Sequence, residues 1–287
     1  HVVTTIIARF FETRRGLAMG IATSGATAGQ LLLMPVLGFM LAGAGWRWGF
    51  VGLGLLALAL APIAWLLLRP KAGRRPPPRR AARAAAGGQR RLWRDPVFHA
   101  LLWSFVICGF TTSGTIEVHL LPYATACGFP PQQSTLAYGV LMAFNLVGMI
   151  TAGWLADRMH RPLLLGLIYI VRGASFLVLM NIVGDLPLLL GFAVLFGLFD
   201  YATVPVTASL VASHLGLRVM GLAMGILSAG HALGAALGAF LAGWLYDLFA
   251  QYLWVWAASL VLAMGAGFIS FTIRERRGPL VAASAPA

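Results

Sequence analysis

Long apolar stretches separated by short polar connectors run through the whole chain. Eight of them are long enough to cross a membrane as a helix, which takes about 20 mostly apolar residues. They cover residues 16–41, 46–68, 96–124, 133–156, 162–183, 186–212, 217–246 and 250–273. None alternates apolar and polar residues as barrel strands do. The pattern predicts eight transmembrane α-helices, with residues 1–11 as the end of a ninth.

The connectors between these stretches alternate in character. One set is short and nearly uncharged, at residues 42–45, 125–132, 183–187 and 247–251. The other set is basic, at residues 12–16, 69–94, 157–161, 214–218 and 274–277. Basic loops stay on the cytoplasmic side of a membrane. We therefore expect the basic set and the C-terminus to be cytoplasmic.

Composition supports a multi-pass membrane protein. Hydrophobic residues make up 60% of the chain, charged residues only 10%, and the mean hydropathy is +0.85. A soluble domain has about 25% charged residues. The net charge of +13 does not indicate nucleic-acid binding, because ten of the 21 Lys and Arg residues lie between Arg69 and Arg94 without base-stacking aromatic residues or polar readers. That stretch is rich in Pro, Gly and Ala, which indicates a mobile linker that could also touch anionic lipid.

The hexapeptide GLAMGI occurs twice, at residues 16–21 and 221–226. The offset of 205 also superposes glycines: Gly25 on Gly230, Gly29 on Gly234 and Gly38 on Gly243. Six predicted spans separate the copies, an even number, so both helices begin on the same side of the membrane and the repeat is parallel. If each half has six helices, GLAMGI opens the fifth of each. Four helices should then precede residue 16, and we expect this chain to be N-terminally truncated and unable to transport alone.

This organisation resembles the major facilitator superfamily, whose two parallel halves are joined by a cytoplasmic linker. The stretch GWLADRMHR at residues 153–161 is similar to the superfamily's signature loop, Gly-x-x-x-Asp-Arg-x-Gly-Arg, with His160 in place of a glycine. The resemblance implies an all-α membrane fold with eight complete helices and the tail of one more out of twelve. It divides the chain into the end of the N-terminal half (1–69), the linker (70–95), the C-terminal half (96–273) and a cytoplasmic tail (274–287).

Three phrases narrow the resemblance: RRGLAMGI, EVHLLPYATACGF at 117–129 and YIVRGASF at 169–176. They are similar to a bacterial branch related to monocarboxylate and oxalate/formate carriers. Asn145 and Met149 stand where monocarboxylate carriers have Asp and Arg. The resemblance implies a monomeric secondary transporter of the bacterial inner membrane that moves a small organic solute, an organic anion ahead of others, by alternating access. The alternatives are a multidrug/proton exporter and a receptor or scaffold that transports nothing.

Polar residues inside the apolar stretches are the candidates for function, because burying them in a bilayer is costly. Arg172 is either a carboxylate-binding cation or the partner of Asp200 in an internal ion pair. Asp200 could carry a proton or be structural, and it should share a helix face with Thr203 and Thr207 near Pro205.

Four further residues complete the set of candidates for a substrate or ion pathway. His231 is a candidate for proton coupling or anion contact, or a hydrogen-bonded residue between helices. Asn145 lies at a comparable depth. Glu117 and His119 lie nearer the outer face and, two residues apart, should point to different sides of their helix.

The resemblance implies that the signature loop of one half lies against the fifth helix of the other half. We expect Asp157 to lie near the first GLAMGI, where a helix N-terminus favours a carboxylate, and to latch the cytoplasmic side shut. The residues assigned to this gate are Gly16, Gly20, Gly153, Asp157, Arg158 and Arg161. No phosphate-binding loop, HExxH or metal-ligand spacing is present, so neither an enzyme nor a cofactor is expected.

Overall fold

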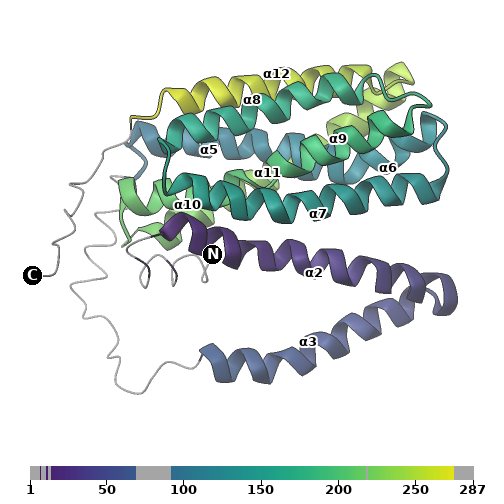
Figure 1. The fold of residues 1–287 in the computed structure, drawn as a ribbon, viewed down its shortest axis with the longest axis horizontal. Helices are drawn as coiled ribbons and strands as arrows, with labels where there is room; N and C mark the ends of the chain where they lie inside the picture. The colour runs from purple at the N-terminus through teal and green to yellow at the C-terminus, as the bar shows by residue number, and fades with distance from the viewer. Residues whose placement is uncertain (1–6, 8–10, 12–13, 69–91, 218, 275–287) are drawn as a thin grey trace, which may run out of the picture.

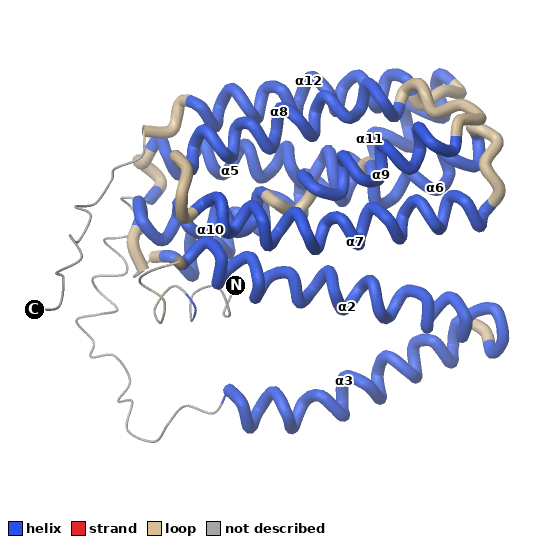
Figure 2. The backbone as a smooth tube through the Cα atoms, viewed as in Figure 1, coloured by secondary structure: helices blue, strands red, loops and turns tan. Residues whose placement is uncertain are grey.

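The computed structural model describes residues 7, 11, 14–68, 92–217 and 219–274. These residues form helices and loops, with no strand among them (Figure 2). Most of residues 1–11 and of the basic linker lie outside the described residues, as do residues 275–287. The ninth-helix tail and the linker predicted from the sequence therefore remain predictions.

All eight predicted spans correspond to a helix or to a helix with a break. The helices are α2 (Arg15–Ala44), α3 (Trp46–Leu68), α5 (Pro96–Gly109), α6 (Ile116–Ala126), α7 (Pro131–Ala156), α8 (Arg161–Leu179), α9 (Leu186–Phe199), α10 (Thr203–Leu210), α11 (Met220–Phe249) and α12 (Leu253–Phe271). Two π-helical turns, η1 (Phe110–Gly114) and η2 (Val211–Leu215), follow α5 and α10. Within the described residues, seven segments meet the length and hydropathy of a membrane span, and α2 is the eighth predicted helix.

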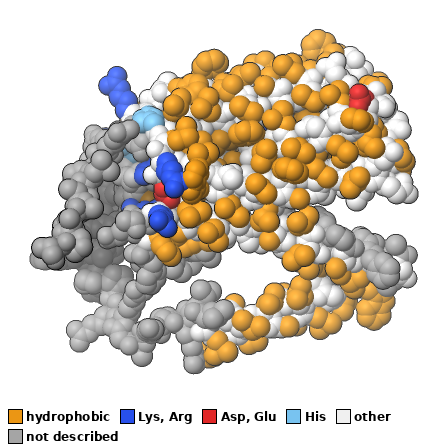
Figure 3. All heavy atoms as spheres, in the orientation of Figure 1, with side chains coloured by type: hydrophobic (Ala, Val, Ile, Leu, Met, Phe, Trp, Pro, Cys, Tyr) orange, Lys and Arg blue, Asp and Glu red, His pale blue; other side chains and the backbone are white. Residues whose placement is uncertain are grey.

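The helices α5 to α12 form a bundle (Figure 1). α2 runs along α7, and α3 returns beneath α2 and stands apart from the bundle. The face of the bundle seen in Figure 3 is largely apolar, and basic side chains gather at one end of it. We call this the basic end, and it contains residues 14–17, 157–161 and 213–217.

The bundle core consists of two apolar clusters. One lies toward the basic end and includes Phe98, Leu165 and Leu227, and the other lies toward the opposite end and includes Phe176, Phe192 and Trp256. Between them, at the middle of the helices, is a group of buried polar residues. This polar core comprises Cys108, Thr111, Asn145, Arg172, Asp200 and Thr203.

The predicted span 186–212 is interrupted. α9 ends at Phe199 and α10 begins at Thr203, with a turn between them (Figure 2). Pro205 explains the interruption, because proline has no N–H to donate and its ring clashes with the carbonyl four residues earlier, that of Tyr201. The expectation that Asp200, Thr203 and Thr207 share one continuous helix face is therefore wrong.

The predicted span 96–124 widens into the π-helical turn η1. Threonine hydroxyls accompany this turn: Thr111 Oγ1 donates to the Ile107 carbonyl (2.9 Å) and Thr112 Oγ1 to the Cys108 carbonyl (2.7 Å). Such back-bonding bends helices, and π-bulges concentrate at functional sites. Two of the helices that contribute to the polar core are thus irregular beside it.

Glycines bring α11 into backbone contact with α5 and η1. A Cβ on Gly234 would collide with the Val106 carbonyl, and one on Gly238 would lie 2.6 Å from the Phe110 carbonyl. These glycines therefore allow α11 to pack closely against α5 and η1. At Gly25 and Gly29 of α2, no described atom lies within 4 Å of the position that a Cβ would take.

These contacts predict opposite effects for two substitutions in one helix. Gly234→Ala should destabilise the protein by about 1–3 kcal/mol, because the added methyl group forces α11 away from α5. Gly225→Ala is the matched control: nothing lies within 4 Å of it, so alanine should be neutral or stabilise the helix by up to about 1 kcal/mol. Thermal unfolding in detergent measures both. Equal shifts for the two variants would contradict the packing argument.

Candidate functional site

Arg172 is the centre of the polar core. It projects from α8, is completely buried, and donates through Nη1 to Cys108 Sγ (3.2 Å) and to the main-chain carbonyl of Asp200 (3.1 Å). Nη2 donates to Thr111 Oγ1 (3.3 Å), and the guanidinium lies 4.8 Å from the centre of the Tyr169 ring. Because the Asp200 carbonyl is at the C-terminal end of α9, where a cation is favoured, Arg172 caps the broken helix.

The contact between Arg172 and Asp200 differs from the expected ion pair. The guanidinium meets the main chain, whereas the Asp200 side chain accepts through Oδ2 from Asn145 Nδ2 (3.2 Å). The other carboxyl oxygen, Oδ1, is buried without a hydrogen-bond partner among the described residues. Burial and protein acceptors occupy Arg172, so this geometry favours its structural role over direct binding of a solute carboxylate.

Asn145 links α7 to the break between α9 and α10. Besides donating to Asp200, it accepts through Oδ1 from the main-chain N–H of Tyr201 (3.3 Å). Two glycines allow the helices to approach closely here. A Cβ on Gly148 would collide with the Leu198 carbonyl, and a Cβ on Gly197 would collide with the Leu141 carbonyl. Small residues on both helices thus allow a short amide side chain to hold the broken turn.

Glu117 belongs to a second group, which the sequence analysis did not identify in full. Its Oε1 accepts from the hydroxyl of Tyr201 (2.5 Å) and from Ser113 Oγ (3.1 Å). Ser113 and Tyr201 were missed as candidates. The signals for them are the spacing of four between Ser113 and Glu117, which places both on one helix face, and the position of Tyr201 directly after Asp200.

The remaining candidates have separate surroundings. His119 contacts the Ala239 carbonyl through Nε2 (3.0 Å) and Tyr252 OH through Nδ1 (3.4 Å), so it joins α6 to α11 and is set apart from Glu117, as its spacing predicted. His231 is partly exposed beside the Phe105 ring, with 5.8 Å between ring centres. Thr203 Oγ1 lies 3.6 Å from Cys108 Sγ.

At the basic end, Asp157 contacts the N-terminus of α2. Its Oδ1 accepts from the main-chain N–H of Gly16 (2.7 Å) and its Oδ2 from that of Leu17 (2.9 Å). We call this pair of bonds the Asp157 latch. It confirms the contact expected between the signature loop and the first GLAMGI. A carboxylate suits this position because the first N–H groups of a helix have no partner within the helix.

Glycines make the latch possible. A Cβ on Gly16 would collide with the Gly153 carbonyl, and one on Gly20 would lie 2.6 Å from the Met149 carbonyl. α2 and α7 therefore meet backbone to backbone directly beneath the latch. Any larger residue at these positions would separate Asp157 from the N–H groups that it accepts from.

Arg158 and Arg161 of the signature loop make recorded contacts that do not involve α2. The Arg158 guanidinium lies 3.7 Å from the centre of the Trp154 ring. Arg161 donates to the Ala156 carbonyl (3.1 Å) and to Ser213 Oγ (2.8 Å). His160, which replaces the signature glycine, has a φ of −67°, and this conformation is open to any residue. The substitution therefore leaves the turn intact.

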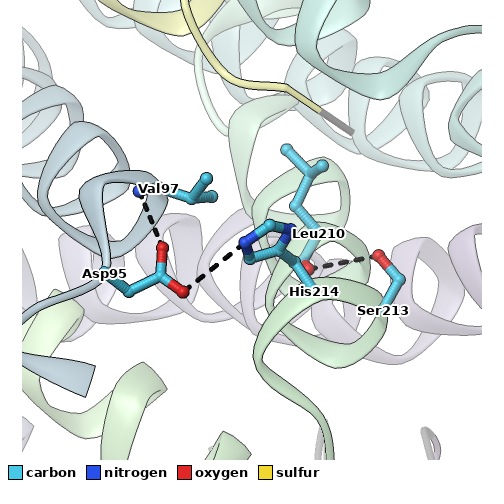
Figure 4. A network of polar contacts seen from close by, with 5 residues as sticks. All are labelled: Asp95, Val97, Leu210, Ser213 and His214. Carbon is cyan, nitrogen blue, oxygen red and sulfur yellow. Dashed lines mark hydrogen bonds and ion pairs between the residues drawn. The ribbon is translucent and has the colours of Figure 1, made fainter. Parts of the chain in front are cut away.

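A neighbouring network ties η2 to the start of α5 (Figure 4). Asp95 caps α5 by accepting from the Val97 N–H (2.9 Å), and its second oxygen lies 3.5 Å from His214 Nε2. Ser213, which receives the bond from Arg161, itself donates to the Leu210 carbonyl (3.2 Å). Polar contacts thus connect the signature loop through η2 to the first helix after the linker.

Comparison with known families decides the assignment. The family model described as Major Facilitator Superfamily matches residues 1–183 and residues 118–287. The chain belongs to the major facilitator superfamily. The all-α membrane fold expected from the repeat and the signature loop is confirmed.

Individual members of the superfamily are similar over most of the chain. The uncharacterized MFS-type transporter YcxA of Bacillus subtilis (strain 168) is 28% identical over 276 residues, which are 90% of this chain and 65% of the relative. Monocarboxylate transporter 12 of Mus musculus is 27% identical, over 86% of this chain and 57% of the relative. Monocarboxylate transporter 11 of Homo sapiens is 32% identical, over 90% and 56%. The chain spans less than two thirds of the length of each of these relatives.

The polar core predicts that Arg172 contributes to stability. Arg172→Gln should lower the free energy of unfolding by about 1.5–3 kcal/mol, because bonds from a charged group to Cys108, Thr111 and the Asp200 carbonyl are lost in a buried site. Arg158→Gln is the control, since Arg158 lies at the surface beside Trp154. Unfolding in detergent compares the two. An unchanged stability of Arg172→Gln would contradict the capping role.

The Asp157 latch predicts the closure of the basic end. Asp157→Ala removes a capping interaction of about 0.5–2 kcal/mol. Ser24 on α2 is buried and close in size to cysteine. Labelling of Ser24→Cys by a water-soluble maleimide should therefore become roughly two- to thirtyfold faster in the Asp157→Ala variant.

The maleimide can also label the two native cysteines, Cys108 and Cys127. This background labelling is measured on the protein that retains Ser24 and is subtracted. Arg158→Ala changes the same loop without touching α2 and should leave the labelling rate unchanged. Equal rates with and without Asp157 would show that the carboxylate does not hold the two helices together.

Proposed function

We propose that the chain forms part of a secondary active transporter that moves a small organic solute across a membrane by alternating access. Residues 1–69 would end the N-terminal six-helix half, 70–95 would link the halves, 96–273 would form the C-terminal half and 274–287 the tail. The proposal is for a transporter that functions as a monomer, needs no cofactor and is not an enzyme. The relatives named above are transporters or are named as such.

The Asp157 latch carries the proposal. It joins α2, assigned to one half, to the loop between α7 and α8 of the other, at the basic end. A contact of two hydrogen bonds at a helix terminus is strong enough to bias one state and weak enough to open. Alternating access requires such an interface, because one end must close while the other opens.

An organic anion is the substrate that the relatives favour, since several are named monocarboxylate transporters. Arg172 does not supply the anion's counter-charge in this proposal, because its guanidinium is buried and bonded within the C-terminal half. His231 is the partly exposed candidate of this half that can become cationic. Proton coupling, by symport or antiport, would drive the transport.

The orientation follows from charge. The basic end would face the cytoplasm, since arginines gather there (Figure 3) and basic loops are retained on that side. The C-terminus would lie on the same side. The similarity to a Bacillus subtilis protein supports a bacterial plasma membrane, with the inner membrane as the location in a cell that has two.

A multidrug/proton exporter is the second candidate. One observation favours it: Glu117 is a partly exposed carboxyl group to which a cationic solute could bind. A receptor or scaffold that moves nothing is a third possibility, and transport assays distinguish it from both carriers.

Ligand screening and transport test the proposal together. With the helices that complete the N-terminal half, the protein should gain thermal stability with carboxylates such as lactate, pyruvate or oxalate. It should also take up the best of them in proteoliposomes. Stabilisation and uptake of tetraphenylphosphonium alone would favour the exporter. Stabilisation by a ligand that is never transported would favour the receptor.

A further inference from the structure

Two acidic residues, Glu117 and Asp200, lie in the described interior of the bundle. Glu117 is partly exposed and accepts hydrogen bonds from hydroxyl groups, whereas Asp200 is buried and accepts from an amide. We propose that Glu117 binds and releases the coupled proton, and that Tyr201 conveys this event to the break between α9 and α10. The inference rests on the proposed transport function, and one of its tests below is independent of transport.

The surroundings of Glu117 suit reversible protonation. Both of its recorded donors, Ser113 Oγ and Tyr201 OH, are neutral hydroxyls, and both bond to the same oxygen, Oε1. Among the described residues, no arginine or lysine is recorded as a partner of this carboxyl group. An ionised carboxylate without a cation is costly in an apolar medium, and binding a proton removes that cost.

The other titratable groups around Glu117 come from three packed elements. Tyr138 of α7 and His231 of α11 lie close enough to interact with it electrostatically. Asp200 and Tyr201 face it from the turn between α9 and α10. The bundle thus places a second carboxyl group and a histidine near Glu117, and the balance of charge among the three changes when a proton arrives.

Asp200 is less suited to exchange protons with water. It is 1% exposed, Asn145 covers one of its oxygens, and Arg172 holds its main-chain carbonyl. Glu117 is partly exposed, and its Oε2 has no hydrogen-bond partner recorded among the described residues. A hydronium ion would therefore transfer its proton to Oε2 of Glu117: one O–H bond of the hydronium breaks, one O–H bond forms on the carboxyl group, and water is left. Release of the proton to water reverses this step.

Tyr201 is the link between this proton and the fold. Its hydroxyl donates to Glu117, its main-chain N–H donates to Asn145, and the preceding carbonyl accepts from Arg172. A carboxylate is a stronger acceptor than a carboxylic acid, since a charged partner roughly doubles the strength of a hydrogen bond. Of these three contacts, only the bond from the Tyr201 hydroxyl involves Glu117. Protonation of Glu117 therefore weakens this bond and leaves the other two unchanged. The broken turn is then freer to move.

Infrared difference spectroscopy against pH tests the proton site without a substrate. The complete protein should show the carbonyl stretch of a protonated carboxylic acid appearing as the pH falls. This band should be lost in Glu117→Gln and retained in Asp247→Asn, which changes an exposed acidic residue in the last turn of α11. A band that persists unchanged in a folded Glu117→Gln variant would overturn the assignment.

Transport tests the coupling. In proteoliposomes with lactate or pyruvate as probe, Glu117→Gln should lose accumulation driven by a proton gradient and keep exchange of internal for external probe. Tyr201→Phe should keep the titrating infrared band and accumulate less, because the proton still binds but no longer reaches the helix break. Full proton-driven accumulation by Glu117→Gln would overturn the proposal, and full accumulation by Tyr201→Phe would overturn the role of Tyr201.

These measurements separate the inference from the function on which it rests. If the wild-type protein moved neither carboxylates nor tetraphenylphosphonium, the proposed function would fail. The infrared titration would still decide whether Glu117 exchanges a proton. Thermal unfolding of each variant, with Glu117→Asp as the conservative change, distinguishes a loss of coupling from a loss of folding.

Discussion

The cost of burying polar groups in an apolar bundle governs this structure. A guanidinium at the middle of a membrane helix needs acceptors, and a broken helix needs donors for the carbonyls at its end. Arg172 and the end of α9 meet these two needs in one contact, since the guanidinium bonds to the Asp200 carbonyl. Each feature would be unfavourable without the other. The break between α9 and α10 and Arg172 of α8 are thus a single structural unit.

The packing around the polar core follows from this unit. A short turn held by Arg172 on one side and Asn145 on the other brings α7, α8 and α9 close together at one level of the bundle. Helices can approach so closely only through small residues, and Gly148 and Gly197 lie on the facing helices there. Apolar clusters above and below then exclude water, which strengthens the polar bonds between them.

The sequence predicted the helices well because hydrophobic length is a direct consequence of bilayer thickness. The contact of Asp157 with the first GLAMGI was predicted from the resemblance to the superfamily, in which the signature loop of one half lies against the fifth helix of the other. The breaks were harder to place. Pro205 lies within the predicted span 186–212, but an apolar stretch looks the same whether or not its backbone is continuous. The expected shared face of Asp200, Thr203 and Thr207 failed for this reason.

Side-chain pairing was predicted least well, because residue type does not distinguish a main-chain acceptor from a side-chain acceptor. The sequence placed Arg172 and Asp200 on neighbouring helices and suggested an ion pair, whereas the structure uses the Asp200 carbonyl. Ser113 and Tyr201 were missed because a hydroxyl in an apolar stretch usually bonds to its own helix, as those of Thr111 and Thr112 do. Spacing along the helix indicates such a pair only once the acidic partner is known to face inward.

The Asp157 latch shows which feature of the first GLAMGI phrase the contact requires. The carboxylate bonds to main-chain N–H groups, so these bonds involve no side chain at the start of the helix. What the contact requires is room, and Gly16 and Gly20 provide it against the backbone of α7. The constraint is therefore the absence of side chains at two positions one turn apart. The second copy carries the same two glycines, at 221 and 225, in the first turns of α11.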